Sequence, residues 1–166
     1  MDAEPSLIYR DNEIACFVVG DLAVYRDVGV ATPSDSSWKQ YVRALQRAIP
    51  RLERSMVVPR PAGLTARQRE EIRRLIGSRP TAVVTGSLVN RCIITSLSWF
   101  KVPIHAFAPG AYRDALRWLG CERLLASVLR GFELYPPTAN RRRALDAHDP
   151  DASGLAPSDS DAPPPG

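Results

Sequence analysis

A threonine with arginines on both sides is the first residue whose type and position could support chemistry. Residues 59–65 are PRPAGLT, and residues 65–68 (TARQ) fit a capping box, in which the Thr65 hydroxyl accepts the N3 amide while Gln68 reaches back. A phosphate on Thr65 would lie at a helix N-terminus, where the helix dipole favours negative charge, and Arg60 and Arg67 could add charge-assisted contacts. An ordinary N-cap explains the same threonine without modification and is the favoured interpretation.

A second hydroxyl, that of Ser87, stands at a predicted strand-to-helix turn after Thr85-Gly86. Backbone amides at such a turn could hold an anion. Gly86 is a lone glycine, however, and no phosphate-loop or dinucleotide-binding pattern surrounds it. An N-cap is again the favoured interpretation, and Ser87 joins Thr65, Arg60 and Arg67 as a candidate phospho-switch or anion site.

Histidines and cysteines give little sign of catalysis or metal binding. His105 is the sole histidine of residues 1–136, and residues 102–108 offer it neither a nucleophile nor a partner, although one could come from elsewhere in the fold. Cys16, Cys92 and Cys121 stand in apolar contexts without Cys-x-x-Cys spacing. The sequence therefore predicts that the protein is not an enzyme and binds no cofactor and no metal. An enzyme that uses His105 is kept as the third hypothesis, after the two that are given at the end of this section.

Charge is divided unevenly along the 166 residues. The net charge of +4 combines two parts, because residues 1–143 hold all 22 basic residues and 13 of the 18 acidic ones, a net +9, whereas residues 144–166 hold five Asp and no base. The arginines of residues 43–51 and 67–79 form basic faces, yet no aromatic residues interleave with them and no nucleic-acid-binding motif accompanies them. A solvated Arg-rich surface is therefore expected rather than nucleic-acid binding.

Several protein classes are excluded by composition. No apolar run approaches the ~18 residues that a membrane span needs, and three scattered cysteines do not make a disulfide framework. The N-terminus (MDAEPSLIYRD) carries two early acids and neither a basic nor an apolar signal region, so a cytoplasmic protein is expected.

The elements that must position these residues follow from apolar patterns. Three short runs at residues 7–9, 14–19 and 22–30 predict an antiparallel meander. Further strands are predicted at 56–58, 81–85 and 102–107, the last at a sheet edge because of Pro103. Helices are predicted over residues 34–49, 64–76, 88–100, 111–119 and 122–134, with Leu124, Leu125, Val128, Leu129 and Phe132 on the inner face of the last.

This order predicts an α/β fold with a mixed sheet, antiparallel at its N-terminal strands and parallel afterwards, with helices packed on it. Residues 1–136 form the expected domain. Residues 137–166 are rich in Pro and Asp, lack aromatic residues and carry two Leu, so this acidic tail is expected to be disordered.

The element order and residues 83–120 (VVTGSLVNRCIITSLSWFKVPIHAFAPGAYRDALRWLG) resemble STAS-like proteins, the group containing anti-sigma-factor antagonists. They most resemble an uncharacterised bacterial branch with a similar strand, a helix ending in Leu-Ser-Trp-Phe and an edge strand ending in Ala-Phe. The resemblance covers about residues 7–120. In the regulatory members a phosphorylatable serine opens the helix after the third core strand, usually in an Asp-Ser context. The matching turn here is residues 59–65, which has no Asp-Ser pair and offers Thr65 as its hydroxyl.

The resemblance implies a non-enzymatic interaction or signalling-regulatory module whose partner is another protein or a second copy of the chain. The alternative is a small-ligand module of similar fold that binds a nucleotide or a lipid. Its site would be the turns at residues 59–65 and 85–87, because open α/β sheets bind ligands beyond the carboxyl ends of their strands.

Overall fold

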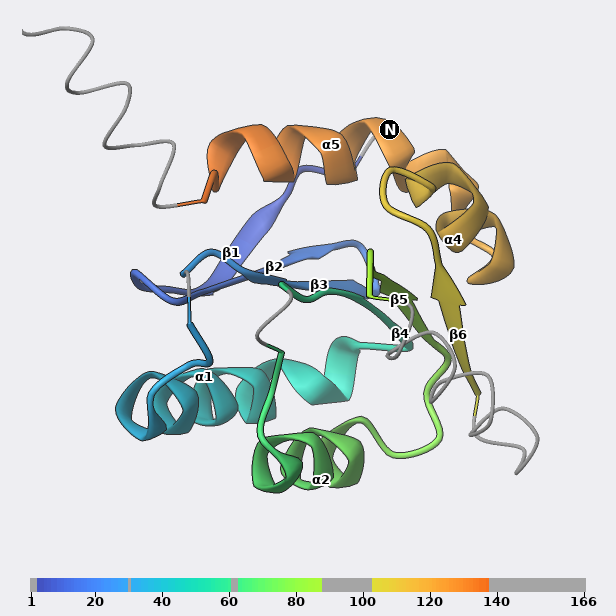
Figure 1. Cartoon of the computed structure of the whole chain (residues 1–166). Helices are drawn as coiled ribbons and strands as arrows, with labels where there is room; N and C mark the ends of the chain where they lie inside the picture. The colour runs from blue at the N-terminus through green and yellow to red at the C-terminus, as the bar shows by residue number, and fades with distance from the viewer. Residues whose placement is uncertain (1–2, 30, 61–62, 88–102, 138–166) are drawn as a thin grey trace, which may run out of the picture.

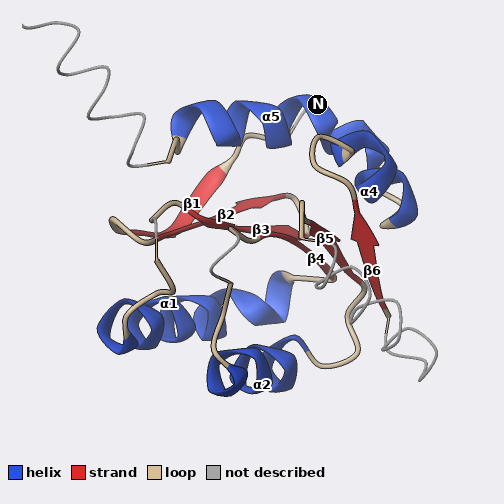
Figure 2. Ribbon diagram, viewed as in Figure 1, coloured by secondary structure: helices blue, strands red, loops and turns tan. Residues whose placement is uncertain are grey.

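The computed structural model describes residues 3–29, 31–60, 63–87 and 103–137, which form one sheet with helices on both faces (Figures 1 and 2). Six strands follow one another across the sheet in chain order: β1 (Ser6–Arg10), β2 (Ile14–Val19), β3 (Leu22–Asp27), β4 (Arg54–Val58), β5 (Thr81–Val84) and β6 (Ile104–Phe107). β1, β2 and β3 pair antiparallel, whereas β3 to β6 are parallel. The predicted mixed α/β fold is confirmed, and β6 is the edge strand that Pro103 predicts.

The helices form two layers. α1 (Asp35–Ala48), its 3-10 extension η1 (Ile49–Arg51) and α2 (Ala66–Ile76) cover one face of the sheet, and α4 (Tyr112–Trp118), η2 (Glu122–Leu124) and α5 (Leu125–Leu134) cover the other (Figure 1). The helix predicted over residues 88–100 and the predicted disordered tail lie outside the described residues. In the described part of the chain, no helix has the length and apolar character needed to cross a membrane.

Two expectations are corrected at the ends of elements. The strand predicted over residues 22–30 ends at Asp27, because the amides of Val28 and Gly29 turn to the carbonyl of Glu13, at 2.9 and 3.1 Å. Leu129, expected on the inner face of the last helix, is 41% exposed, and that helix begins with the 3-10 turn η2. The buried positions of α5 are Ser127, Val128 and Gly131. Leu129 follows Val128 by one residue, or 100° around the helix, and so lies outside this buried face.

The period of two along the strands divides the core into two clusters. Phe17, Val24 and Met56 face α4 and α5, where Leu116 and Val128 join them. Their neighbours along the strands, including Cys16 and Tyr25, face α1, where they meet Trp38, Tyr41 and Leu45. Both clusters contain side chains with no exposed surface, so the sheet is buried on both sides, as parallel strands require.

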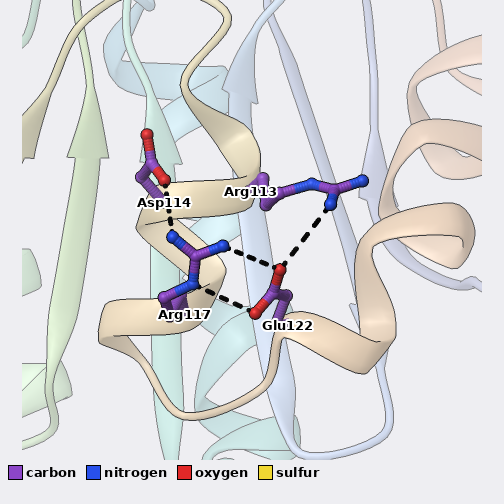
Figure 3. A network of polar contacts seen from close by, with 4 residues as sticks. All are labelled: Arg113, Asp114, Arg117 and Glu122. Atoms are coloured by element: carbon purple, nitrogen blue, oxygen red, sulfur yellow. Dashed lines mark hydrogen bonds and ion pairs between the residues drawn. The ribbon is translucent and has the colours of Figure 1, made fainter.

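A network of charged side chains closes the corner between α4 and η2 (Figure 3). Arg117 donates to Asp114 and to both carboxylate oxygens of Glu122, each at 3.1 Å, while Arg113 lies 3.9 Å from Glu122. The bonds from Arg117, more than its charge, hold the pKa of Glu122 below its usual value. Gly120 has a φ of 70°, the left-handed conformation that ends a helix, and lets the chain turn at this corner.

α5 lies close to the sheet because it has a glycine at the point of contact. A Cβ added to Gly131 would overlap the ring of Phe17, which is fully buried in β2. The ring also meets Phe132 edge-on, with centroids 5.9 Å apart, and Tyr135 at 5.5 Å. Phe132 and Tyr135 therefore restrict the movement of the Phe17 ring away from Gly131.

We expect Gly131→Ala to destabilise the protein by about 1–3 kcal/mol, since overlap with a fixed ring exceeds the gain of up to about 1 kcal/mol from placing alanine in a helix. Urea unfolding of both proteins measures the difference. Phe17→Leu in the Gly131→Ala background removes the overlapping ring atoms, so the two substitutions together should cost less than their sum. An additive double mutant would contradict the proposed overlap.

Candidate functional site

The parallel strands end at one edge of the sheet, and the predicted site residues lie at or beside this edge. The turn after β4 holds Arg60 and leads to Thr65, the turn after β5 holds Ser87, and Arg67 lies in the first turn of α2. Asp27 ends β3 at the same edge. This is the edge where open α/β sheets present binding residues.

Thr65 is the N-cap of α2, as predicted. Its Oγ1 accepts a hydrogen bond from the amide of Gln68 at 3.1 Å, and the side-chain oxygen of Gln68 accepts from the amide of Thr65 at 2.9 Å, which completes the capping box. Thr65 itself is exposed, so its hydroxyl is open to solvent at the positive end of an 11-residue helix.

The side chain of Gln68 makes a second hydrogen bond, which the capping-box pattern does not predict. Its side chain is 2% exposed, and its Nε2 donates to the carbonyl of Pro33 at 2.9 Å, just before α1. The start of α2 is thereby fixed against the start of α1. A second bond between the two helices runs from Nε1 of Trp38 to Glu71, at 2.8 Å.

The two candidate arginines do not bind Thr65. The backbone amide of Arg60 donates to Asp27 at 3.1 Å, and its carbonyl accepts from the amide of Gly63 at 3.0 Å, in the turn that leads to α2. The guanidinium of Arg67 is exposed and lies 3.9 Å from the carboxylate of Asp35. The guanidinium that lies at this turn is that of Arg69, whose Nη1 donates to the carbonyl of Leu64 at 2.7 Å.

Asp27 is the residue at this edge that sequence reasoning missed. Its carboxyl group is 3% exposed and accepts hydrogen bonds from the hydroxyl of Tyr25 and the amide of Arg60. Burial raises the pKa of Asp27, although the bonds from Tyr25 and Arg60 and the charge of Arg60 act in the opposite direction. A buried acid at the end of a strand is a common property of functional sites, and here it also fastens the turn after β4.

Arg26 precedes Asp27 and lies on the opposite face of the sheet. Its guanidinium stacks over the ring of Phe132, 4.8 Å from the centroid, and Nη1 donates to the carbonyl of Phe132 at 3.4 Å. Burial is the main cause that lowers the pKa of Arg26, and the charge of Arg60 adds to it. The pair Arg26-Asp27 at the end of an apolar run was the signal available in the sequence.

Ser87 is held by its neighbour Thr85. The amide of Ser87 donates to Oγ1 of Thr85 at 3.2 Å, and Thr85, which is 3% exposed, bonds through its own amide to the carbonyl of Phe107 at 3.0 Å. Ser87 is half-buried. Its predicted role as a cap depends on residues outside the described ranges.

His105 lies on the exposed side of the edge strand β6. Its ring stacks on Trp118, with centroids 5.6 Å apart and an angle of 28°, and lies 4.9 Å from the ring of Phe107. These contacts account for the residue as part of an aromatic surface. Within the described ranges, no three histidine, cysteine or acidic residues lie close enough together to hold a metal ion.

The thiols of Cys16 and Cys121 are free and buried. Burial raises the pKa of Cys16 to about 12 and also raises that of Cys121. Both thiols are therefore protonated at neutral pH, and a protonated thiol is a poor nucleophile.

A cavity of about 60 Å³ lies between the sheet and the helices α1 and α2. Its walls are mostly apolar and include Tyr25, Trp38, Tyr41, Leu45 and Ile72. Pockets that enclose small molecules usually measure roughly 300–1,000 Å³. This cavity is too small to enclose a nucleotide or a lipid chain without rearrangement of its walls.

Asp27 should give the protein a measurable pH dependence. Because its pKa in the folded chain lies above the ordinary 3.8, the stability that it contributes is complete below pH 3.8 and is lost as pH rises through its folded pKa. Asp27→Asn removes this loss. Urea unfolding from about pH 3 to about pH 7 should show the variant gaining stability relative to the wild type. A difference that is constant, or of the opposite sign, would exclude a raised pKa.

Thr65 should be needed for the stability of α2. Thr65→Ala deletes the oxygen that accepts the Gln68 amide and should cost about 1 kcal/mol of unfolding free energy. Thr65→Ser keeps the oxygen, and because serine is at least as good an N-cap as threonine, it should leave the stability unchanged or slightly higher. Thermal and urea unfolding of the three proteins measure this order. Equal stability of the Ala and Ser variants would show that the cap contributes nothing.

Comparisons with known proteins identify no relative of this chain: no family model matches it, and no match is found among curated proteins or solved structures.

Proposed function

We propose that the protein is a cytoplasmic, non-enzymatic interaction module of the STAS-like type, which regulates or recruits a protein partner through the surface around Thr65. The observation that carries the proposal is the placement of Thr65: an exposed hydroxyl that caps the helix opening directly after a central parallel strand. The resemblance to STAS-like proteins puts their regulatory hydroxyl at the start of the corresponding helix.

The surroundings of Thr65 suit a docking surface. The backbone behind it is held by two buried groups, since Asp27 binds the amide of Arg60 and Gln68 binds the carbonyl of Pro33. The first turn of α2 presents the exposed arginines Arg67 and Arg69. A rigid base with exposed polar groups is what a specific interface requires, because little ordering entropy is then lost on binding.

A phosphate on Thr65 would add about −1.5 to −2 charge at the helix N-terminus. The helix dipole and Arg69, whose Nη1 donates to the carbonyl of Leu64 at 2.7 Å, favour that charge, so α2 would remain folded while the positive potential of the surface decreased. Such a change alters partner affinity without altering the fold. This is the switch form of the proposal, and it depends on the same residue.

A small-ligand module is the second candidate, with the turns at residues 59–65 and 85–87 as its site. It has less support because the cavity between the sheet and α1 and α2, at about 60 Å³, is below the size of a nucleotide or lipid pocket, and neither Thr65 nor the turn at residues 85–87 lines it. Among the described residues, the larger groove between β1 and α1 is lined by residues of neither turn. Native mass spectrometry of freshly purified protein would detect a co-purifying ligand mass and so favour this candidate.

The proposal predicts that a charge at residue 65 changes partner binding. Thr65→Glu should reduce recovery of the wild-type partner at least tenfold in affinity purification from the source organism, whereas Thr65→Ser should recover it as the wild type does. Ser36→Glu is the matched control, because it adds the same charge at an exposed position of α1.

Quantitative mass spectrometry of the captured proteins measures the result. Equal capture by the wild type, the Thr65→Glu protein and the Ser36→Glu protein would exclude Thr65 from the interface. Turnover of a metabolite, together with no captured partner, would refute the non-enzymatic function itself.

A further inference from the structure

A groove of about 740 Å³ runs between the edge strand β1 and the helix α1. One wall is β1 with the adjoining Val18 and Gly20, and the other is the flank of α1 and η1 that carries Arg43, Arg47 and Arg51. β1 is the first strand of the sheet, so its outer edge has no neighbouring strand among the described residues. Leu7 on this strand is 46% exposed. An unpaired strand edge is a surface that proteins usually cover or protect.

The three arginines of this groove are exposed and lack acidic partners within the described ranges. The acid of the opposite wall, Glu4, is already paired with Arg130 of α5 at 2.7 Å. The arginines of α2 differ, since Arg73 and Arg74 both bind Glu70, at 2.8 and 2.9 Å. Uncompensated positive charge is therefore concentrated in the groove, where an acidic segment would be attracted.

The chain itself carries such a segment, and the domain ends close to one end of β1, on the face of the sheet opposite α1. α5 ends where Arg10, the last residue of β1, donates to the carbonyl of Leu134 at 3.3 Å and lies 5.7 Å from the ring centroid of Tyr135. Residues 144–166, which follow this exit, hold five aspartates and no base. A second copy of the domain would bring the same positive excess, so it does not match the charge of the groove.

Length also permits the contact. Asp146 is nine residues beyond Pro137, so an extended chain reaches up to about 30 Å, whereas β1 is about 17 Å long. Asp146, Asp149 and Asp151 span about 17 Å when extended, and Arg43 to Arg51 span about 12 Å along α1 and η1. The segment that carries these three aspartates is therefore long enough to pass all three arginines.

We propose that residues 144–166 bind in the groove between β1 and α1 of the same molecule, with their aspartates facing Arg43, Arg47 and Arg51. The tail thereby neutralises the basic flank of α1 and shields the open edge of β1. Each exposed ion pair is weak, yet tethering gives the tail an effective concentration near millimolar, which makes a weak contact persistent at low salt. This inference concerns a surface distinct from Thr65 and does not depend on the proposed function.

The test uses the full chain and a labelled peptide of residues 144–166, whose binding is followed by fluorescence anisotropy at low salt. The tail-neutral variant carries Asp146→Asn, Asp149→Asn, Asp151→Asn, Asp159→Asn and Asp161→Asn. If the peptide binds with a Kd near 0.1 mM, the tethered tail of the wild type should weaken its binding about tenfold relative to the tail-neutral variant. Equal affinity of the two proteins would overturn the proposal.

Two further variants in the tail-neutral background locate the contact. Replacing Arg43, Arg47 and Arg51 by alanine should weaken peptide binding at least tenfold, and replacing them by lysine should preserve most of it. The matched control replaces Arg67, Arg69 and Arg74 of α2 by alanine, which removes the same charge and should leave binding within twofold. If peptide binding weakens equally in the two alanine variants, net charge alone explains the loss, and the assignment to the groove is overturned.

Sedimentation of the wild type separates binding within one molecule from binding between molecules. A monomer across concentrations is expected. A dimer that dissociates in the tail-neutral variant would assign the groove to the tail of a second copy and overturn the proposal of binding within one molecule.

Discussion

The buried amide of Gln68 fixes where two helices begin, and the position of the candidate site depends on it. Its oxygen accepts the amide of Thr65 and its nitrogen donates to the carbonyl of Pro33, both at 2.9 Å, while its side chain is 2% exposed. A buried amide without these partners would cost roughly 1–3 kcal/mol, so the two helix starts are constrained to remain together. Thr65 is thus presented at a defined point above the sheet.

A second buried group completes this constraint from the side of the sheet. Asp27 ends β3 and binds the amide of Arg60, so the turn after β4 is attached to the neighbouring strand. The carboxylate of Asp27 holds the start of the turn at residues 59–65, and the capping box of Thr65 and Gln68 holds its end. Rigidity here has a local origin and does not require a large interface between helices, since α1 and α2 meet at a few side chains such as Trp38 and Glu71.

The fold class and most elements could be predicted because their signals are local. The run IACFVV at residues 14–19 and the capping box at residues 65–68 each determine structure within a few residues, and the structure confirms both. The end of β3 could not be predicted, because it depends on the carbonyl of Glu13, the residue just before β2, which is the strand paired with β3. Leu129 was misplaced because two of the three buried positions of α5, Ser127 and Gly131, are not large apolar residues, so the apolar pattern does not mark the centre of the buried face.

The candidate site was predictable in its hydroxyl and not in its surroundings. A cap has a sequence pattern, so Thr65 could be identified from residues 65–68 alone. The bond from the backbone amide of Arg60 to Asp27, which joins residues 33 positions apart, was not expected from the sequence. No local pattern encodes such a pairing, because it exists only after β3 and β4 have paired in parallel.

Charge spacing, more than charge number, distinguishes the two basic helices. In α2, Glu70 lies three and four residues before Arg73 and Arg74, so it reaches both on one helix face. In α1, no acid follows Asp35, and Arg43, Arg47 and Arg51 repeat at every fourth residue along one flank. Their like charges repel one another unless a segment from elsewhere compensates them. The four arginines of α2 are therefore partly balanced by two glutamates, whereas the three arginines of α1 and η1 form a surface that attracts acids.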